Sequence, residues 1–174
     1  MTVEEFMQLR EVRNAPLELI NGRIVDDCEP SCGPVIHEWV KSNLIQILAE
    51  WVRRNSSLKL FSGAPVQLDD SITAIPDIAL FSGLTTEGID SFHNTPALVV
   101  EVISSDGAAE LETRISRYLK EGTNSVWAVF PETQSVWVYD PSGGARYFGG
   151  DQTLIGRAGL SDFSVPVSAI FEGI

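Results

Sequence analysis

The chain is poor in basic side chains. Its 174 residues include 12 Lys and Arg against 24 Asp and Glu, which gives a formal net charge of -12. A protein that holds nucleic acid along the phosphate backbone regardless of sequence normally presents a basic surface, so this charge argues against that class of binder. The charge does not exclude a local site where a divalent cation bridges carboxylates to one phosphate group.

Cysteine is equally scarce. Cys28 and Cys32 are too few for the disulfide framework of a small secreted protein. They would supply two ligands of a structural zinc site, which needs four, and the only histidines are His37 and His93. Two free thiols in a loop are the favoured interpretation, and a zinc site is the alternative.

Long apolar runs are also missing. No segment approaches the roughly 20 apolar residues of a membrane-spanning helix. The charged N-terminal segment lacks the apolar centre of a signal peptide, so we expect a cytoplasmic protein with no membrane partner. The composition, 44% hydrophobic and 21% charged, is ordinary for a globular protein, and the length suits one domain over residues 1–174.

Hydrophobic periodicity divides the chain into elements. Thr2 and Glu5 form a capping box that opens a short helix, and Asn21-Gly22 predicts a hairpin between strands 17–20 and 23–26. Apolar stripes predict one long helix over 35–54 and a second between residues 104–107 and Gly122. Further strands are predicted at 58–61, 64–68, 76–81, 97–103, 125–130, 135–139 and 146–148, followed by a C-terminal tail. This order predicts an α/β fold, a mixed β-sheet with two main helices packed on it.

Glu101 interrupts the segment ALVVEVI, a strand that we expect to be buried on both faces. A buried carboxylate is costly unless it is paired, protonated or bound to a metal. A functional role is therefore one interpretation. The other is that the strand end reaches solvent or that an arginine pairs with the glutamate.

Asp77 begins an apolar strand directly after Pro76, a place where aspartate is common for structural reasons alone. It becomes a candidate ligand only together with Glu101, 24 residues later on the next strand. If the two strands pair, two carboxylates meet at the strand ends, and with water molecules they form the oxygen ligand set that Mg²⁺ prefers. An ion bound in this way activates water and stabilises a departing phosphate oxygen.

Several segments, in this order and spacing, resemble the Uma2 family of the PD-(D/E)XK, restriction-endonuclease-like superfamily. They are LELINGRIV, His37 at the start of the long helix, PDIAL, ALVVEVISS, RYLKEGTNSVWAVFPETQSVWVY and VPVSAIF. The resemblance covers nearly the whole chain. It implies a nuclease fold, a Mg²⁺ or Mn²⁺ cofactor, nucleic acid as the partner with DNA as the favoured substrate, and a homodimer.

The resemblance also implies roles for individual residues. Asp77 and Glu101 match the two acids of the metal site, and Glu18 matches an additional acidic position of the family. His37 matches a family histidine that faces the metal cleft; its alternative role is that of a surface residue at a helix start.

The chain departs from the family pattern where a lysine is expected. The superfamily position two residues after the second acid holds Ile103, and the family's lysine on the following helix aligns with Arg114. Arginine keeps the charge but does not readily accept a proton. Its alternative role is a helical ion pair with Glu110, four residues earlier. Ile75 and Phe130 replace the Arg and Asp that family members often carry.

The leading hypothesis is a divalent-metal-dependent endonuclease that hydrolyses phosphodiester bonds. Asp77 and Glu101 are its predicted metal ligands, and Glu18, His37 and Arg114 complete the predicted catalytic site. A catalytically silent nuclease-fold module for binding or assembly is the main alternative, favoured by the missing lysine and the net charge. A metal phosphohydrolase acting on small phosphate compounds is the third.

Overall fold

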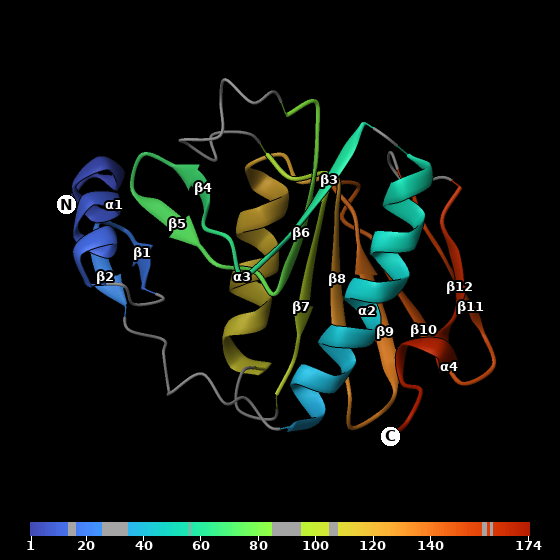
Figure 1. Cartoon of the computed structure of the whole chain (residues 1–174). Helices are drawn as coiled ribbons and strands as arrows, with labels where there is room; N and C mark the ends of the chain where they lie inside the picture. Colours follow the sequence, from blue (N-terminus) through green and yellow to red (C-terminus); the bar gives the residue numbers. More distant parts are fainter. Residues whose placement is uncertain are drawn as a thin grey trace.

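A six-stranded sheet with the strand order β10-β9-β8-β7-β6-β3 forms the centre of the protein (Figure 1). The structure is a computed structural model that describes residues 1–13, 17–25, 35–55, 57–84, 95–104, 108–157, 160 and 162–174. The strands are β3 (Leu58–Ser62), β6 (Ile78–Ser82), β7 (Leu98–Val102), β8 (Ser125–Phe130), β9 (Ser135–Tyr139) and β10 (Ala145–Gly149). β7 and β8 are parallel, and the other neighbouring strands are antiparallel. The predicted mixed sheet is confirmed.

Two helices cover the opposite faces of this sheet. α2 (Val35–Arg54) has the predicted bounds and buries Val40 and Leu44 against one face of the sheet. α3 (Ala108–Lys120) packs Ile115 and Tyr118 on the other face. All five residues of β7 are buried between the two helices, including Glu101, as the near-continuous apolar run predicted.

A smaller sheet, in the order β2-β1-β5-β4, stands beside the central one together with α1 (Val3–Arg13) (Figure 1). Its strands are β1 (Glu18–Ile20), β2 (Arg23–Val25), β4 (Val66–Asp69) and β5 (Ile72–Ala74). The predicted hairpin is confirmed, because Asn21 and Gly22 both have positive φ, at 51° and 72°, as its tight turn requires. The capping box is confirmed as well: the Thr2 hydroxyl oxygen accepts the N–H of Glu5 at 3.3 Å.

The two strands predicted around Gly63 belong to different sheets, which the sequence did not indicate. β3 pairs with β6 in the central sheet, whereas β4 pairs with β5 in the small one. β5 was not predicted, because it has only three residues and its middle residue is the polar Thr73. Thr73 is nonetheless buried, since β1 and β4 flank this strand.

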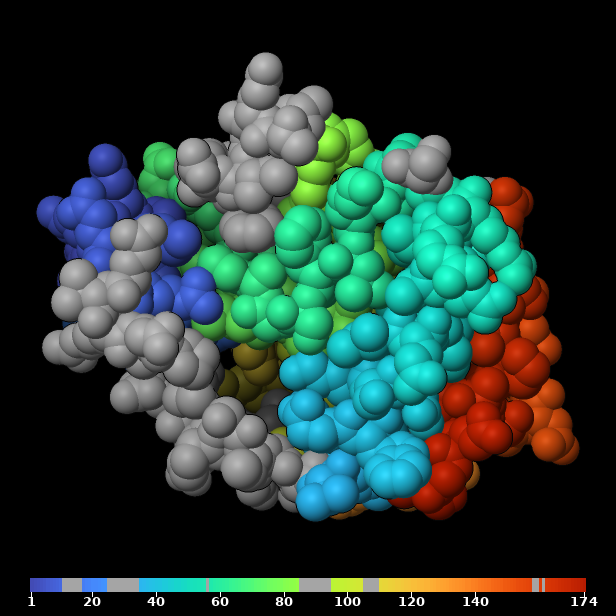
Figure 2. Space-filling model, in the orientation of Figure 1, coloured from blue at the N-terminus to red at the C-terminus, as the bar shows by residue number. Residues whose placement is uncertain are grey.

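The C-terminal tail forms β11 (Thr153–Ile155), β12 (Ser164–Pro166) and α4 (Val167–Ile170). Leu154 and Ile170 are fully buried in the core that α2 also lines. The Asn43 amide on α2 donates to the carbonyl oxygens of Ile170 and Glu172, at 3.1 and 3.0 Å. Figure 2 shows the surfaces of α2 and of this tail in contact, so the tail completes the face of the sheet that α2 covers.

Three residues of the zinc analysis, Cys28, Cys32 and His93, lie outside the described residues, so the thiol interpretation stays a prediction. In the part of the chain that the structure describes, no helix is long and apolar enough to cross a membrane.

We predict that Val100→Ala, at the fully buried centre of β7, lowers the free energy of unfolding by about 2 kcal/mol, because it removes buried methyl groups and leaves a cavity. Val35→Ala is the matched control, since Val35 is 82% exposed. Urea unfolding measures both variants. Equal losses of stability in Val100→Ala and Val35→Ala would contradict the buried, central position of β7.

Candidate functional site

An open pocket of about 190 Å³ lies where β6, β7, α2 and α3 approach one another. Four of the residues that the sequence singled out line it: His37, Asp77, Glu101 and Arg114. Much of the remaining lining is apolar and includes Ile103, the residue at the superfamily's lysine position. Glu18 lies beside Arg114 in an adjoining, smaller cavity.

Strand register brings the two predicted metal ligands together. Ile78 of β6 pairs with Val100 of β7 in antiparallel orientation. Asp77 directly precedes Ile78 and Glu101 directly follows Val100, so the two acids stand opposite each other. The carboxylate oxygen Oδ2 of Asp77 accepts the backbone N–H of Val102 at 2.8 Å, which ties Asp77 to the neighbouring strand.

Asp77 is held by two side chains of α2. Its Oδ1 lies 3.0 Å from Nε2 of His37 and 3.3 Å from Nζ of Lys41. Burial acts to raise the pKa of Asp77, but the hydrogen bond and charge of His37, the N–H of Val102 and the charge of Lys41 outweigh it. The pKa of Asp77 therefore lies below its ordinary value. The hydrogen bond with Asp77 raises the pKa of His37 in return.

Glu101 is held by side chains of α3. The Tyr118 hydroxyl donates to its Oε1 at 2.8 Å, and Nε of Arg114 lies 4.0 Å from the same oxygen. Burial raises the pKa of Glu101 to about 7, although the charge of Arg114 acts in the opposite direction. Near neutral pH this carboxyl group is therefore divided between its protonated and ionised forms, whereas Asp77 is ionised.

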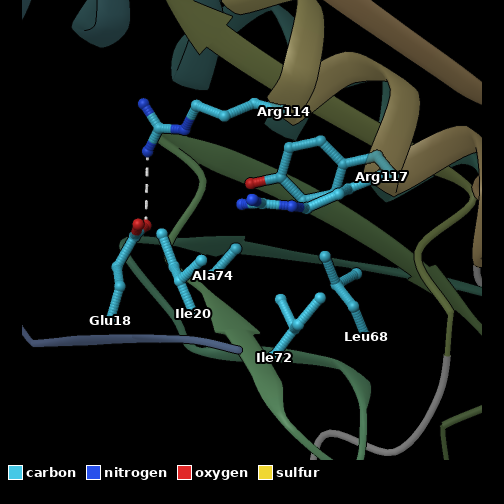
Figure 3. Close-up of a pocket in the computed structure, with 8 residues that line it drawn as sticks. Glu18, Ile20, Leu68, Ile72, Ala74, Arg114 and Arg117 are labelled. Carbon is cyan, nitrogen blue, oxygen red and sulfur yellow. Dashed lines mark hydrogen bonds and ion pairs between the residues drawn. The ribbon is translucent and has the colours of Figure 1, made fainter. Parts of the chain in front are cut away.

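Glu18 connects the N-terminal hairpin to the segment that carries Asp77. Its Oε1 accepts the backbone N–H of Ile75 at 2.8 Å and lies 3.2 Å from Nη2 of Arg114. Figure 3 shows Arg114 reaching from α3 toward Glu18 on β1. Arg114 thus contacts two carboxylates, Glu18 and Glu101, that belong to different sheets.

The cavity around Glu18 is too small for a substrate. Its volume is about 10 Å³, roughly one water molecule. Apolar residues of the small sheet and the polar side chains of α3 close it (Figure 3). The cavity beside Glu18 is therefore of water size, whereas the larger pocket has room for a ligand.

Two residues of the site were missed from the sequence. Lys41 follows His37 by four residues on α2, and Tyr118 follows Arg114 by four residues on α3. Residues with this spacing share one helix face, so each was detectable as a neighbour of a candidate residue. The Tyr118 ring belongs to the apolar stripe of α3, so the sequence pattern does not distinguish it from a core residue.

The donor set of the pocket fits a hard divalent cation. Mg²⁺ and ions like it accept one or two carboxylates and retain several water molecules. Asp77 and Glu101 supply two carboxyl groups, and the pocket has room for water. Among the described residues, no group of three or more His, Cys, Asp or Glu side chains is gathered closely enough to hold a metal. The residues present thus suit an ion with a largely aqueous coordination shell.

The family model of Uma2, described as "Putative restriction endonuclease", matches residues 3–168. The chain belongs to the Uma2 family. A crystal structure described as "a putative nuclease belonging to DUF820", from Anabaena variabilis ATCC 29413, superposes with a TM-score of 0.82 at 24% sequence identity. The match covers 98% of this chain and 97% of the Anabaena chain. This similarity confirms the predicted mixed α/β fold, and the family match gives its restriction-endonuclease description. No curated protein matches the sequence significantly.

We predict that the metal-free Uma2 protein loses stability as pH rises from about 4.5 to about 7, because over this range its folded state holds the Glu101 proton that the unfolded chain has already released. The folded pKa lies above the ordinary value of 4.5, so this contribution is complete below about 4.5 and is lost as pH rises through the folded pKa. Glu101→Gln should remove a loss on the order of 3 kcal/mol. Urea unfolding with a chelator, over a pH series, measures it.

Glu50→Gln is the control for this pH series, since Glu50 is a largely exposed glutamate on α2. It should keep the pH dependence of the unmodified protein. If the stability of Glu101→Gln still falls with rising pH as much as that of the unmodified protein, another group causes the fall.

We predict that Glu18→Ala costs about 2 to 3 kcal/mol of stability, because it removes both the acceptor of the Ile75 N–H and the carboxylate beside Arg114. Glu18→Gln keeps an acceptor oxygen and should cost about half as much. Chemical unfolding compares the two, with the exposed Glu132→Ala as control. Equal losses of stability in Glu18→Ala and Glu18→Gln would show that the hydrogen bond to the Ile75 N–H does not contribute to stability.

Proposed function

We propose that this Uma2 protein is a divalent-metal-dependent endonuclease that hydrolyses phosphodiester bonds in DNA. The observation that carries the proposal is the pairing of β6 with β7, which stands Asp77 opposite Glu101 at the wall of an open pocket. Membership of a family described as restriction endonucleases supports the reaction class. The choice of DNA follows from that family likeness.

Asp77 and Glu101 are the proposed ligands of Mg²⁺ or Mn²⁺. Asp77 is prepared for this role because His37 and Lys41 keep its carboxylate ionised and the Val102 N–H fixes its orientation. Glu101 must give up its proton, and a nearby cation favours the ionised form of a carboxyl group. A bound ion of this kind supplies an activated water molecule and a positive charge for the departing oxygen.

Arg114 is the proposed phosphate-binding residue. The Arg114 side chain lines the pocket and is 30% exposed, so an anionic oxygen that enters the pocket can reach it. Charge-assisted hydrogen bonds from arginine suit phosphate oxygens. Glu18 positions Arg114 from the opposite side, and His37 holds a proton beside Asp77.

The net charge of -12 limits how the proposed enzyme holds its substrate. Wide contact with a phosphate backbone is unfavourable for so acidic a protein, so we infer recognition of a few phosphate groups near the pocket. We propose the cytoplasm as its location, since DNA is there. A homodimer stays a prediction from family likeness.

A catalytically silent nuclease-fold module is the second candidate. One specific observation favours it: the carboxyl groups of the pocket already have partners within the protein. Asp77 pairs with His37 and Lys41, and Glu101 pairs with Tyr118. A site of this kind is stable without a cation, and it would serve as a binding or assembly surface.

The test is cleavage of plasmid and single-stranded DNA in the presence of Mg²⁺ or Mn²⁺. We predict that Asp77→Ala and Glu101→Gln each reduce the rate by at least about 100-fold, because each removes a proposed metal ligand. Asp151→Ala, an exposed aspartate in a turn, should leave the rate unchanged.

Metal-dependent cleavage that persists in Asp77→Ala would overturn the assignment of the site. Absence of cleavage and of calorimetric Mn²⁺ binding in the unmodified protein would establish the silent module instead. Hydrolysis of mononucleotides without cleavage of polymers would identify a phosphohydrolase of small phosphate compounds.

A further inference from the structure

Lys41 occupies the side of Asp77 that faces α2. Its ammonium nitrogen lies 3.3 Å from Oδ1 of Asp77 and 3.7 Å from Oε1 of Glu38. Only 19% of the Lys41 side chain is exposed, compared with 80% for Lys120 on α3. Its ammonium group is therefore partly withdrawn from water, and Asp77 is the nearer of its two counter-ions.

Each carboxylate oxygen of Asp77 already has a donor. Oδ2 accepts the Val102 N–H at 2.8 Å, and Oδ1 is shared by His37 and Lys41. The Asp77 side chain is only 15% exposed, so salt and water screen its interactions less than those of a surface pair. A second cation that binds this carboxylate meets the positive charge of Lys41 at close range.

We propose that Lys41 is a positioning residue that regulates metal loading, because its ammonium group and a divalent cation compete for the carboxylate of Asp77. The inference rests on the proposed function, since it takes Asp77 as a metal ligand. Lys41 keeps Asp77 ionised and oriented while no metal is bound, and it must move or share Oδ1 when metal binds. Metal affinity is then set by α2 as well as by the two acids.

A purely structural role of Lys41 has the opposite consequence. If Lys41 only held Asp77 in place, its removal would loosen the carboxylate and weaken metal binding. If it competes with the metal, its removal strengthens binding. The sign of the change in affinity therefore separates the two roles without any measurement of activity.

The experiment is calorimetric titration of the whole chain with Mn²⁺ at one fixed pH. Lys41→Met and Lys41→Gln both remove the charge, and we expect each to bind Mn²⁺ about tenfold more tightly than the unmodified protein. Lys41→Arg keeps a positive charge and should bind as the unmodified protein does. Lys120→Met makes the same change in net charge at an exposed site and should also leave the affinity unchanged. Thermal unfolding without metal verifies that each variant is folded.

Unchanged or weaker Mn²⁺ binding by the folded neutral variants overturns the competition, and the proposed metal site stands. Binding that appears only in Lys41→Met and Lys41→Gln supports it, since the unmodified protein then falls below detection because of Lys41. Absence of binding in all the proteins overturns both this inference and the metal-dependent function. The two failures are thereby distinguished.

Discussion

A carboxyl group in a strand that is covered on both faces must find a partner for its charge or keep its proton. In β7 this group is Glu101, and much of the arrangement around the pocket follows from it. Tyr118 donates to it, and Arg114 lies near the same oxygen. Arg114 is itself only partly exposed and contacts Glu18, whose hairpin thereby joins the small sheet to the site.

The two opposed acids differ because different elements surround them. Asp77 faces the cationic side of α2, and its pKa is lowered despite burial. Glu101 faces α3, and burial raises its pKa to about 7. Pairs of titratable groups whose pKa values are driven apart are typical of functional sites, although structural networks also produce them. Here the difference gives one carboxyl group that is ionised near neutral pH and one that is divided between its protonated and ionised forms.

Elements with a long, regular pattern were predictable. α2, β8 and β9 have the predicted bounds, because their apolar residues repeat with one period over the whole element and meet a core on a known face. β5 and the strands and helix of the C-terminal tail were not predicted. Three-residue strands carry almost no periodicity, and these segments are ordered by the strands and by α2, which come from other parts of the chain.

The sequence by itself determined Glu101 as a candidate, since an acid inside an apolar strand is conspicuous in its local context. Asp77 became a candidate through its spacing from Glu101, and the order of the segments determined the family. Only the tertiary structure decided their partners. Glu18 and Arg114 are 96 residues apart, and His37 and Asp77 are 40 apart. Periodicity shows which residues share a helix face but not what that face meets. For that reason Lys41 became part of the site only when α2 packed on the sheet.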